Sequence, residues 1–92
     1  MFILLSTLTQ QGIQTLKSNP ERLREVNKDI EELGARVVDQ WATLGEFDFV
    51  NVVEAPDVAT IAKVSVSLAA RGSVRIETLP ALGIEEFLQT LE

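Results

Sequence analysis

The sequence contains no cysteine, no histidine and no tyrosine, and these absences narrow the chemistry that the chain can perform. Without cysteine there are no disulfides, no thiolate nucleophile and no cysteine metal site. Without histidine, acid–base catalysis would fall to carboxylates or lysine, and a serine or threonine nucleophile would have no obvious base. The sequence also lacks a phosphate-binding loop and a dinucleotide fingerprint. We therefore assign no catalytic residue and expect no cofactor.

Basic residues are also scarce: 8 Lys and Arg stand against 14 Asp and Glu, for a formal net charge of −6. This balance disfavours nucleic acid and anionic membrane surfaces as partners, because phosphates would be repelled and no basic stripe compensates. A metal site would need oxygen ligands alone, and the acidic residues of residues 21–32 have the spacing of a solvated helix face. We expect no metal site.

The 92 residues are enough for one small domain, spanning residues 1–92, with a thin core. Residues 1–8 are apolar but too short for a membrane span, and no basic region precedes them, so a strand is expected there. With no signal peptide visible, the expected location is the cytoplasm.

Residues 2–8 form a run of Ile, Leu and Thr that is typical of a central strand buried on both faces. Gly12 then breaks the run, where we expect it to relieve a local backbone strain, and residues 13–17 fit a single helical turn.

A longer helix is predicted next. It begins either at Asn19, with Pro20 in the first helical position, or at Ser18, which would form a capping box with Glu21. Gly34 follows as a left-handed stop. The apolar face of this helix consists of Leu23, Val26, Ile30 and Leu33.

The segment from residue 36 to residue 53 predicts a hairpin. Residues 36–44 mix polar and apolar side chains in both alternating rows, which suits an edge strand. Gly45 and Glu46 predict a tight turn, and residues 47–53 are nearly all apolar, as in a central strand.

Residues 57–72 are ambiguous. Residues 63–68 alternate strictly between polar and apolar, which is typical of a strand, whereas a helical stripe runs from Val58 to Ala69 between an Asp57 cap and a Gly72 stop. We predict a helix, because a helix also supplies the crossover that a parallel strand needs.

Residues 73–79 predict the last strand, and residues 84–91 a short C-terminal helix. Right-handed crossovers turn the order strand, helix, strand, strand, helix, strand into an α+β ferredoxin-like βαββαβ fold. It has a four-stranded antiparallel sheet with both main helices on one face.

The other face of this sheet is bare in a single chain. Four strands give a face of roughly 400 Å², near the largest apolar patch that a monomer usually exposes. We expect a second copy to cover it. The side chains predicted to face the helices are Ile3, Leu5, Val50, Val52, Val74 and Ile76. Those predicted on the bare side are Leu4, Ser6, Trp41, Phe49, Asn51, Val53, Arg75, Glu77 and Leu79.

The residues around the hairpin resemble the GYD domain family of small bacterial and archaeal proteins. Its motif is a glycine followed, one residue on, by tyrosine and aspartate, and Gly45, Phe47 and Asp48 match it with phenylalanine in the tyrosine position. The resemblance extends over nearly the whole chain, through residues 9–13, 18–22, 33–34, 53–57 and 72–79.

This resemblance implies a ferredoxin-like domain of the dimeric α+β barrel kind, related in shape to the ligand-binding domain of leucine-responsive regulators. It supplies no activity, and Phe47 lacks the hydroxyl that the family tyrosine would carry.

Five residues are candidates for ligand binding: Trp41, Asp48, Asn51, Arg75 and Glu77. All but Asn51 have a structural alternative. Asp48 could instead accept hydrogen bonds from backbone N–H groups near the hairpin. Trp41 could serve as a packing anchor. Arg75 and Glu77 could pair across an oligomer interface.

Two functions remain open on the sequence. The first is a non-enzymatic homodimer or higher homo-oligomer, formed through the open sheet face, that binds a small ligand or simply assembles. The second is a small cofactor-free enzyme, oxygenase- or isomerase-like, whose site between sheet and helices would use Trp41, Asp48 and Arg75. The sequence leaves ligand, pathway and oligomer size undetermined.

Overall fold

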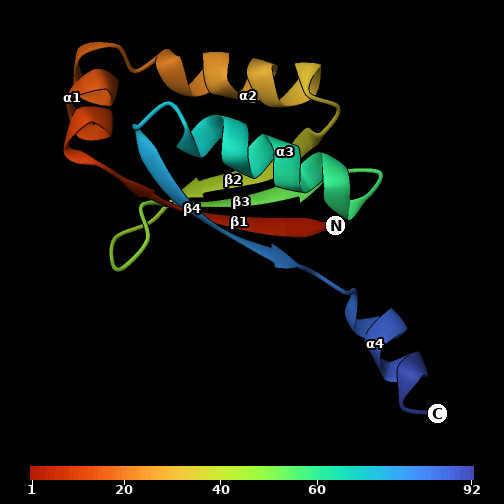
Figure 1. Ribbon diagram of the computed structural model, residues 1–92. Coiled ribbons are helices and arrows are strands. Elements are labelled where there is room, and N and C mark those ends of the chain that lie inside the picture. The colour runs from red at the N-terminus through yellow and green to blue at the C-terminus, as the bar shows by residue number, and fades with distance from the viewer.

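The computed structural model describes residues 1–92 as one four-stranded sheet and four helices. The elements are β1 (Phe2–Leu8), α1 (Gln10–Ser18), α2 (Arg22–Glu32), β2 (Arg36–Ala42), β3 (Phe49–Glu54), α3 (Val58–Ala69), β4 (Val74–Pro80) and α4 (Ile84–Thr90). The strands pair antiparallel in the order β2-β3-β1-β4, and Figure 1 shows α1, α2 and α3 on one side of the sheet. The ferredoxin-like α+β fold is confirmed, with β1 and β3 central and β2 at an edge.

Both predicted starts of the long helix are wrong, because the polar residues involved complete α1 instead. Ser18 Oγ donates to Gln14 O at 2.8 Å, and the backbone N–H of Asn19 donates to Thr15 O at 2.9 Å. α1 is thus a nine-residue helix rather than one turn, and α2 begins at Arg22 with no side-chain cap. A serine can bond back to the carbonyl four residues earlier, so the same residue type fits both helix ends.

Gly12 allows a close approach rather than relieving strain. Its φ is not positive, but a Cβ at this position would lie 2.0 Å from the backbone oxygen of Ser73. α1 therefore packs directly on the backbone that leads into β4, and only glycine leaves room for it.

The β2–β3 connection is longer than the two-residue turn that Gly45 and Glu46 predicted. Six residues, 43–48, link the strands. The loop is closed by the Thr43 N–H, which donates to Asp48 O at 2.8 Å, and by Thr43 Oγ1, which donates to Phe47 O at 2.6 Å. β2 also contains an irregularity between Val37 and Asp39. This bulge breaks the two-residue alternation and explains why neither row of β2 was cleanly apolar.

α3 confirms the helical interpretation of residues 57–72. Asp57 caps it by accepting hydrogen bonds from the hydroxyl of Thr60 at 2.6 Å and from its backbone N–H at 2.8 Å, and these bonds lower the pKa of the Asp57 carboxyl. Gly72 follows the helix with φ +81° and Gly34 follows α2 with φ +102°, so both predicted helix stops are confirmed. None of the helices has the length and apolar composition needed to span a bilayer.

The core lies between the sheet and the helices, and it uses the opposite rows of β1 and β3 from those predicted. Its members are Phe2, Leu4, Ile30, Ala35, Val53, Ile61, Val64 and Leu68. In β1 and β3 the predicted facing was wrong for Ile3, Leu4, Leu5, Ser6, Phe49, Val50, Asn51, Val52 and Val53. Both rows of these strands are largely apolar, so alternation could not distinguish them. The pairing of Ser6 with Ile76 places the two on one face.

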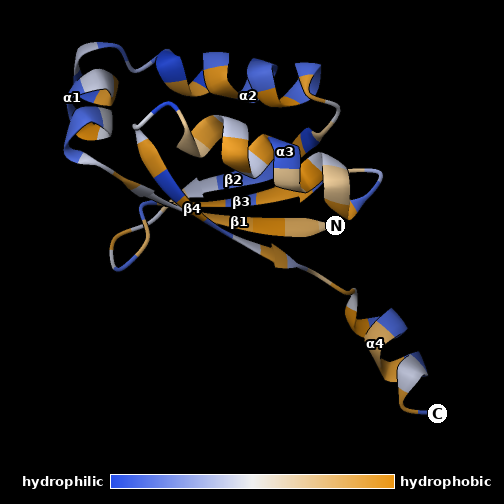
Figure 2. Ribbon diagram, viewed as in Figure 1, coloured by the Kyte–Doolittle hydropathy of each residue, from blue (hydrophilic) through white to orange (hydrophobic).

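α4 stands apart from the rest of the molecule, on the side of the sheet away from α1, α2 and α3 (Figure 1). The Ala81 N–H donates to Met1 O at 2.9 Å just after β4, and the chain then leaves the sheet. Figure 2 shows that α4 carries hydrophobic residues although no part of the domain covers it. Its apolar side chains are exposed: Ile84, Phe87, Leu88 and Leu91.

Candidate functional site

The sheet surface turned away from α1–α3, called the open face below, is apolar at its centre. The register places Ile3 opposite Val52 and Leu5 opposite Val50, which puts four aliphatic side chains in the middle of the sheet. They are flanked by Trp41 on β2, which is 51% exposed, and by Leu79 on β4, which is 38% exposed. Four aliphatic groups side by side on an uncovered sheet mark a surface suited to a partner.

Charged residues border this apolar centre. Arg75 and Glu77 lie opposite Thr7 and Leu5 and are exposed on the β4 side. Arg36 pairs with Glu54 across β2 and β3. An apolar middle with a polar rim is the usual composition of a protein–protein interface.

The five candidate residues from the sequence do not form one site. Trp41, Arg75 and Glu77 lie on the open face, whereas Asn51 lies on the covered face and is 7% exposed. Asp48 lies in the β2–β3 loop. The enzyme alternative requires Trp41, Asp48 and Arg75 around a cavity between sheet and helices. None of the three lines the cavity found there, and Trp41 and Arg75 lie on the opposite side of the sheet.

Asp48 joins the loop to the end of β1. Its Oδ2 accepts a hydrogen bond from the Leu8 N–H at 2.7 Å, and its own N–H donates to Ser6 O at 2.8 Å. These are contacts of the kind that the structural alternative for this residue requires. They fix the position of β1 against the start of β3.

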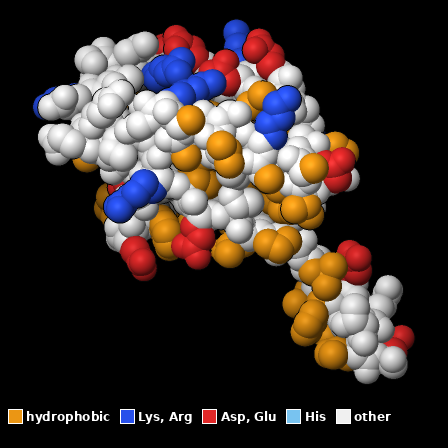
Figure 3. Space-filling model, viewed as in Figure 1, with side chains coloured by type: hydrophobic (Ala, Val, Ile, Leu, Met, Phe, Trp, Pro, Cys, Tyr) orange, Lys and Arg blue, Asp and Glu red, His pale blue; other side chains and the backbone are white.

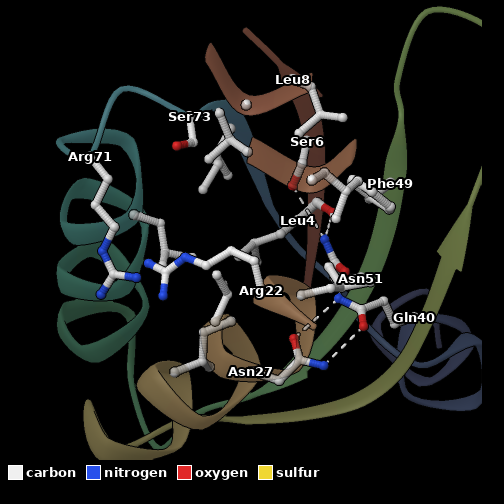
Figure 4. Close-up of a pocket in the computed structure, with 18 of the residues that line it drawn as sticks. Leu4, Ser6, Leu8, Arg22, Asn27, Gln40, Phe49, Asn51, Arg71 and Ser73 are labelled. Atoms are coloured by element: carbon white, nitrogen blue, oxygen red, sulfur yellow. Dashed lines mark hydrogen bonds between the residues drawn. The ribbon is translucent and has the colours of Figure 1, made fainter. Parts of the chain in front are cut away.

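A cavity of about 100 Å³ lies between the covered face and the helices (Figure 4). Most of its wall is apolar, formed from the sheet side by Leu4, Leu8, Phe49, Val74 and Ile76 and from the helix side by Leu16, Leu23, Val26, Ile30 and Leu68. The core is closed at the Val53 end of the sheet, where Val53 and Val64 have no exposed surface, and hollow at the other.

One wall of this cavity carries a chain of hydrogen-bonded polar side chains. Asn51 Nδ2 donates to Leu4 O at 3.2 Å and to Ser6 Oγ at 3.3 Å. Gln40 Nε2 donates to Asn51 Oδ1 at 2.7 Å, and Asn27 Nδ2 donates to Gln40 Oε1 at 2.9 Å. The chain thus runs from β1 through β3 and β2 to α2, and the dashed lines in Figure 4 follow it.

Two arginines stand where the cavity meets solvent. Arg22, at the start of α2, is 36% exposed and donates from Nη1 to Glu25 at 3.0 Å. Arg71, just after α3, is 35% exposed and donates from Nη1 to Asp29 at 2.7 Å. In Figure 4 both guanidinium groups lie toward the same side of the cavity.

Asn51 was among the candidates selected from the sequence, but its hydrogen-bond partners and both arginines were not. Ser6 and Asn51 interrupt strands that are otherwise largely apolar, which is a signal that the sequence does contain. Arg22, Arg71, Asn27 and Gln40 have no such signal, because each belongs to a segment where polar residues are expected.

Comparison with known proteins places the whole chain in a family. The model of the GYD domain matches residues 2–91. A protein of Thermus thermophilus, named glutamine synthetase and cystathionine beta-lyase binding protein, is 52% identical over 92 residues, covering 99% of this chain and 97% of its own. No solved structure matches the chain. A match over nearly the full length identifies the chain as a member of the GYD domain family.

Proposed function

We propose that this chain is a non-enzymatic module that pairs with a second copy through its open face and binds other proteins. The observation that carries the proposal is the uncovered group of Ile3, Leu5, Val50 and Val52 at the centre of the sheet. Burying such a group against a like surface removes apolar area from water, which stabilises the pair by roughly 25 cal/mol per Å² of area buried.

The area of the open face argues that α4 takes part in this pairing. A four-stranded face offers roughly 400 Å², about half of the roughly 800 Å² that each partner buries in a standard interface. α4 projects on the same side of the sheet and leaves Phe87 and Leu88 44% and 48% exposed. In the face-to-face pair, α4 of one copy packs against the other copy and supplies part of the missing area.

Exposed apolar side chains continue from the open face toward α4. Figure 3 shows hydrophobic side chains along the lower margin of the body and again on α4. Leu82, in the segment that links β4 to α4, is 50% exposed. The charged rim, with Arg75 and Glu77, would then meet its counterpart on the second copy, and the two residues would pair across the interface.

The binding of other proteins is supported by the relative from Thermus thermophilus, whose name gives glutamine synthetase and cystathionine beta-lyase as the proteins that it binds. Identity of 52% across the full length makes the corresponding enzymes of this chain's own host the first partners to test. The enzyme alternative is not supported, because the cavity between sheet and helices is lined by none of Trp41, Asp48 and Arg75.

Self-association is tested by placing a charge on the open face. In Val52→Glu a carboxylate replaces one of the four aliphatic side chains. Desolvating this carboxylate against a second copy is costly, so the variant should be monomeric where the parent chain is dimeric. Light scattering after size exclusion measures the mass.

Val66→Glu is the matched control, because Val66 lies on the solvent side of α3 and is 69% exposed. It should leave the mass of the assembly unchanged. A monomeric parent chain at micromolar concentration, or equal masses for the two folded variants, would contradict the pairing.

Protein binding is tested separately, by surface-immobilised binding of the chain to purified glutamine synthetase and cystathionine beta-lyase from its own host. Binding to either enzyme supports the proposal. If a chain that is shown to pair binds neither enzyme, the protein-binding part of the proposal is wrong and the pairing part stands.

A further inference from the structure

We propose that the cavity between the covered face and the helices is a binding site for a small aliphatic monocarboxylate. This site lies on the opposite side of the sheet from the open face, so the proposal does not rest on pairing or on protein partners. It follows from the size of the cavity, its polar wall and the two arginines at its mouth.

The size of the cavity sets the body of the ligand. A dry cavity of about 150 Å³ lined by Leu, Ile and Phe holds a benzene molecule. The cavity here has about 100 Å³ and walls of the same residue types. It therefore suits a body of roughly four carbon atoms by the same measure.

The polar wall distinguishes this cavity from a simple packing void. Side chains from four elements meet there: Ser6 from β1, Asn51 from β3, Gln40 from β2 and Asn27 from α2. The Ser6 hydroxyl accepts from Asn51, which leaves its proton free to bond a ligand. A mostly apolar pocket with a few fixed polar groups is the usual composition of a small-molecule site.

The arginines at the mouth select the charge of the ligand. Each uses one terminal nitrogen for a partly exposed carboxylate, Glu25 or Asp29, and the planar guanidinium has further N–H donors to offer. Planar carboxylates fit this fork in a bidentate manner. Exposed ion pairs of this kind are weak, so a ligand can compete for the same donors.

The same ion pairs argue for a single negative charge. The carboxylates of Glu25 and Asp29 already pair with Arg22 and Arg71, so the mouth offers a ligand unused N–H donors rather than excess positive charge. These donors suit one carboxylate, whereas the second charge of a dianion would lie near Glu25 and Asp29 with no cation of its own. A monocarboxylate is therefore favoured over a phosphate. Its carboxylate lies at the arginines, and its aliphatic body lies among the apolar side chains.

Isovalerate, with a four-carbon body and one carboxylate, is a suitable probe. NMR amide spectra of isotope-labelled protein should show saturable shifts at the cavity residues, such as Ser6, Leu23 and Ser73. Isovaleramide, the neutral analogue, should bind about tenfold more weakly, because it has no negative charge and only one acceptor oxygen to offer a guanidinium. Arg22→Gln should weaken isovalerate binding by about the same factor.

Arg24→Gln is the matched control, because Arg24 is also on α2 but is 80% exposed and pairs with Glu21 away from the cavity. This variant should bind isovalerate like the parent chain. The proposal would be overturned by equal binding of isovalerate and isovaleramide, by tighter binding of inorganic phosphate, or by equal losses in the two arginine variants. Amide shifts that are scattered over the surface and do not saturate would overturn it too.

Discussion

Leu4 and Leu5 are neighbours in β1, yet they belong to two different surfaces of one sheet. Leu4 is 1% exposed beneath the helices, whereas Leu5 lies on the open face and remains only half-buried. The covered face is completed within the chain, and the open face carries aliphatic side chains that nothing in the chain covers. A strand that is apolar on both sides thus completes the core with one row and, in the proposed pairing, offers the other row to a second copy.

The largest expected effect comes from truncating Leu4, with the same truncation of Leu5 as its comparison. Leu4→Ala should lower the free energy of unfolding by about 2–5 kcal/mol, because it removes buried contacts and leaves a cavity. Leu5→Ala should cost only about 1 kcal/mol when the chain is monomeric, because its side chain is partly hydrated already. Chemical denaturation monitored by circular dichroism measures both values.

The dependence of stability on protein concentration gives a second way to distinguish Leu4 from Leu5. The stability of the parent chain should rise with protein concentration, because association stabilises the folded state. Leu5→Ala should weaken this dependence, whereas Leu4→Ala should leave its slope unchanged. Equal losses for both variants at every concentration would mean that the two faces do not differ in role.

A smaller effect is expected at Asp48. Its hydrogen bonds to β1 hold β1 in register with β3, and this register determines which side chains lie on each face. Asp48→Ala leaves the Leu8 N–H without its acceptor and should cost about 1–2 kcal/mol. Asp48→Asn, which keeps an acceptor oxygen, should recover part of this loss. Thermal unfolding of both variants checks the prediction, and two variants as stable as the parent chain would favour the ligand-binding alternative for Asp48.

The smallest effect is expected from Asp57, which caps α3. This helix packs on the covered face, so the effect should not reach the open face. The hydrogen bonds from Thr60 lower the pKa of Asp57 in the folded state, so its ionised form stabilises the fold above about pH 4. This contribution is lost as the pH falls through the lowered pKa. Asp57→Asn should therefore flatten the acid side of the stability curve slightly and leave the self-association of the chain unchanged. Denaturation measured across the acid range checks the first effect, and light scattering checks the second.

The fold was predictable because its strongest signals are local. The apolar runs of β1 and β3, the glycine stops after α2 and α3 and the Asp57 cap each reflect the preferences of a few neighbouring residues. The start of α2 was missed because Ser18 and Asn19 suit either end of a helix. The length of the hairpin loop was missed because Asp48 bonds to β1, which is 40 residues away in sequence.

The candidate site was predictable only in part. Trp41 and Arg75 were correctly placed on the bare side. In β4 the two rows differ, because Val74 and Ile76 alternate with Arg75 and Glu77. The central strands have no such difference, and the faces of their side chains were assigned in reverse. The arginines of the cavity could not be found, since nothing local to Arg22 or Arg71 indicates that α2 and the end of α3 meet over one hollow.

By itself the sequence determined the element order, the ferredoxin-like topology and the family, because these depend on patterns within each segment. The tertiary structure decided which apolar row became core, which became the open face, and where a cavity remained. Those outcomes depend on strand register, on the bulge in β2 and on the packing of helices against the sheet. All three arise from contacts between residues far apart in the chain, which no short stretch of sequence encodes.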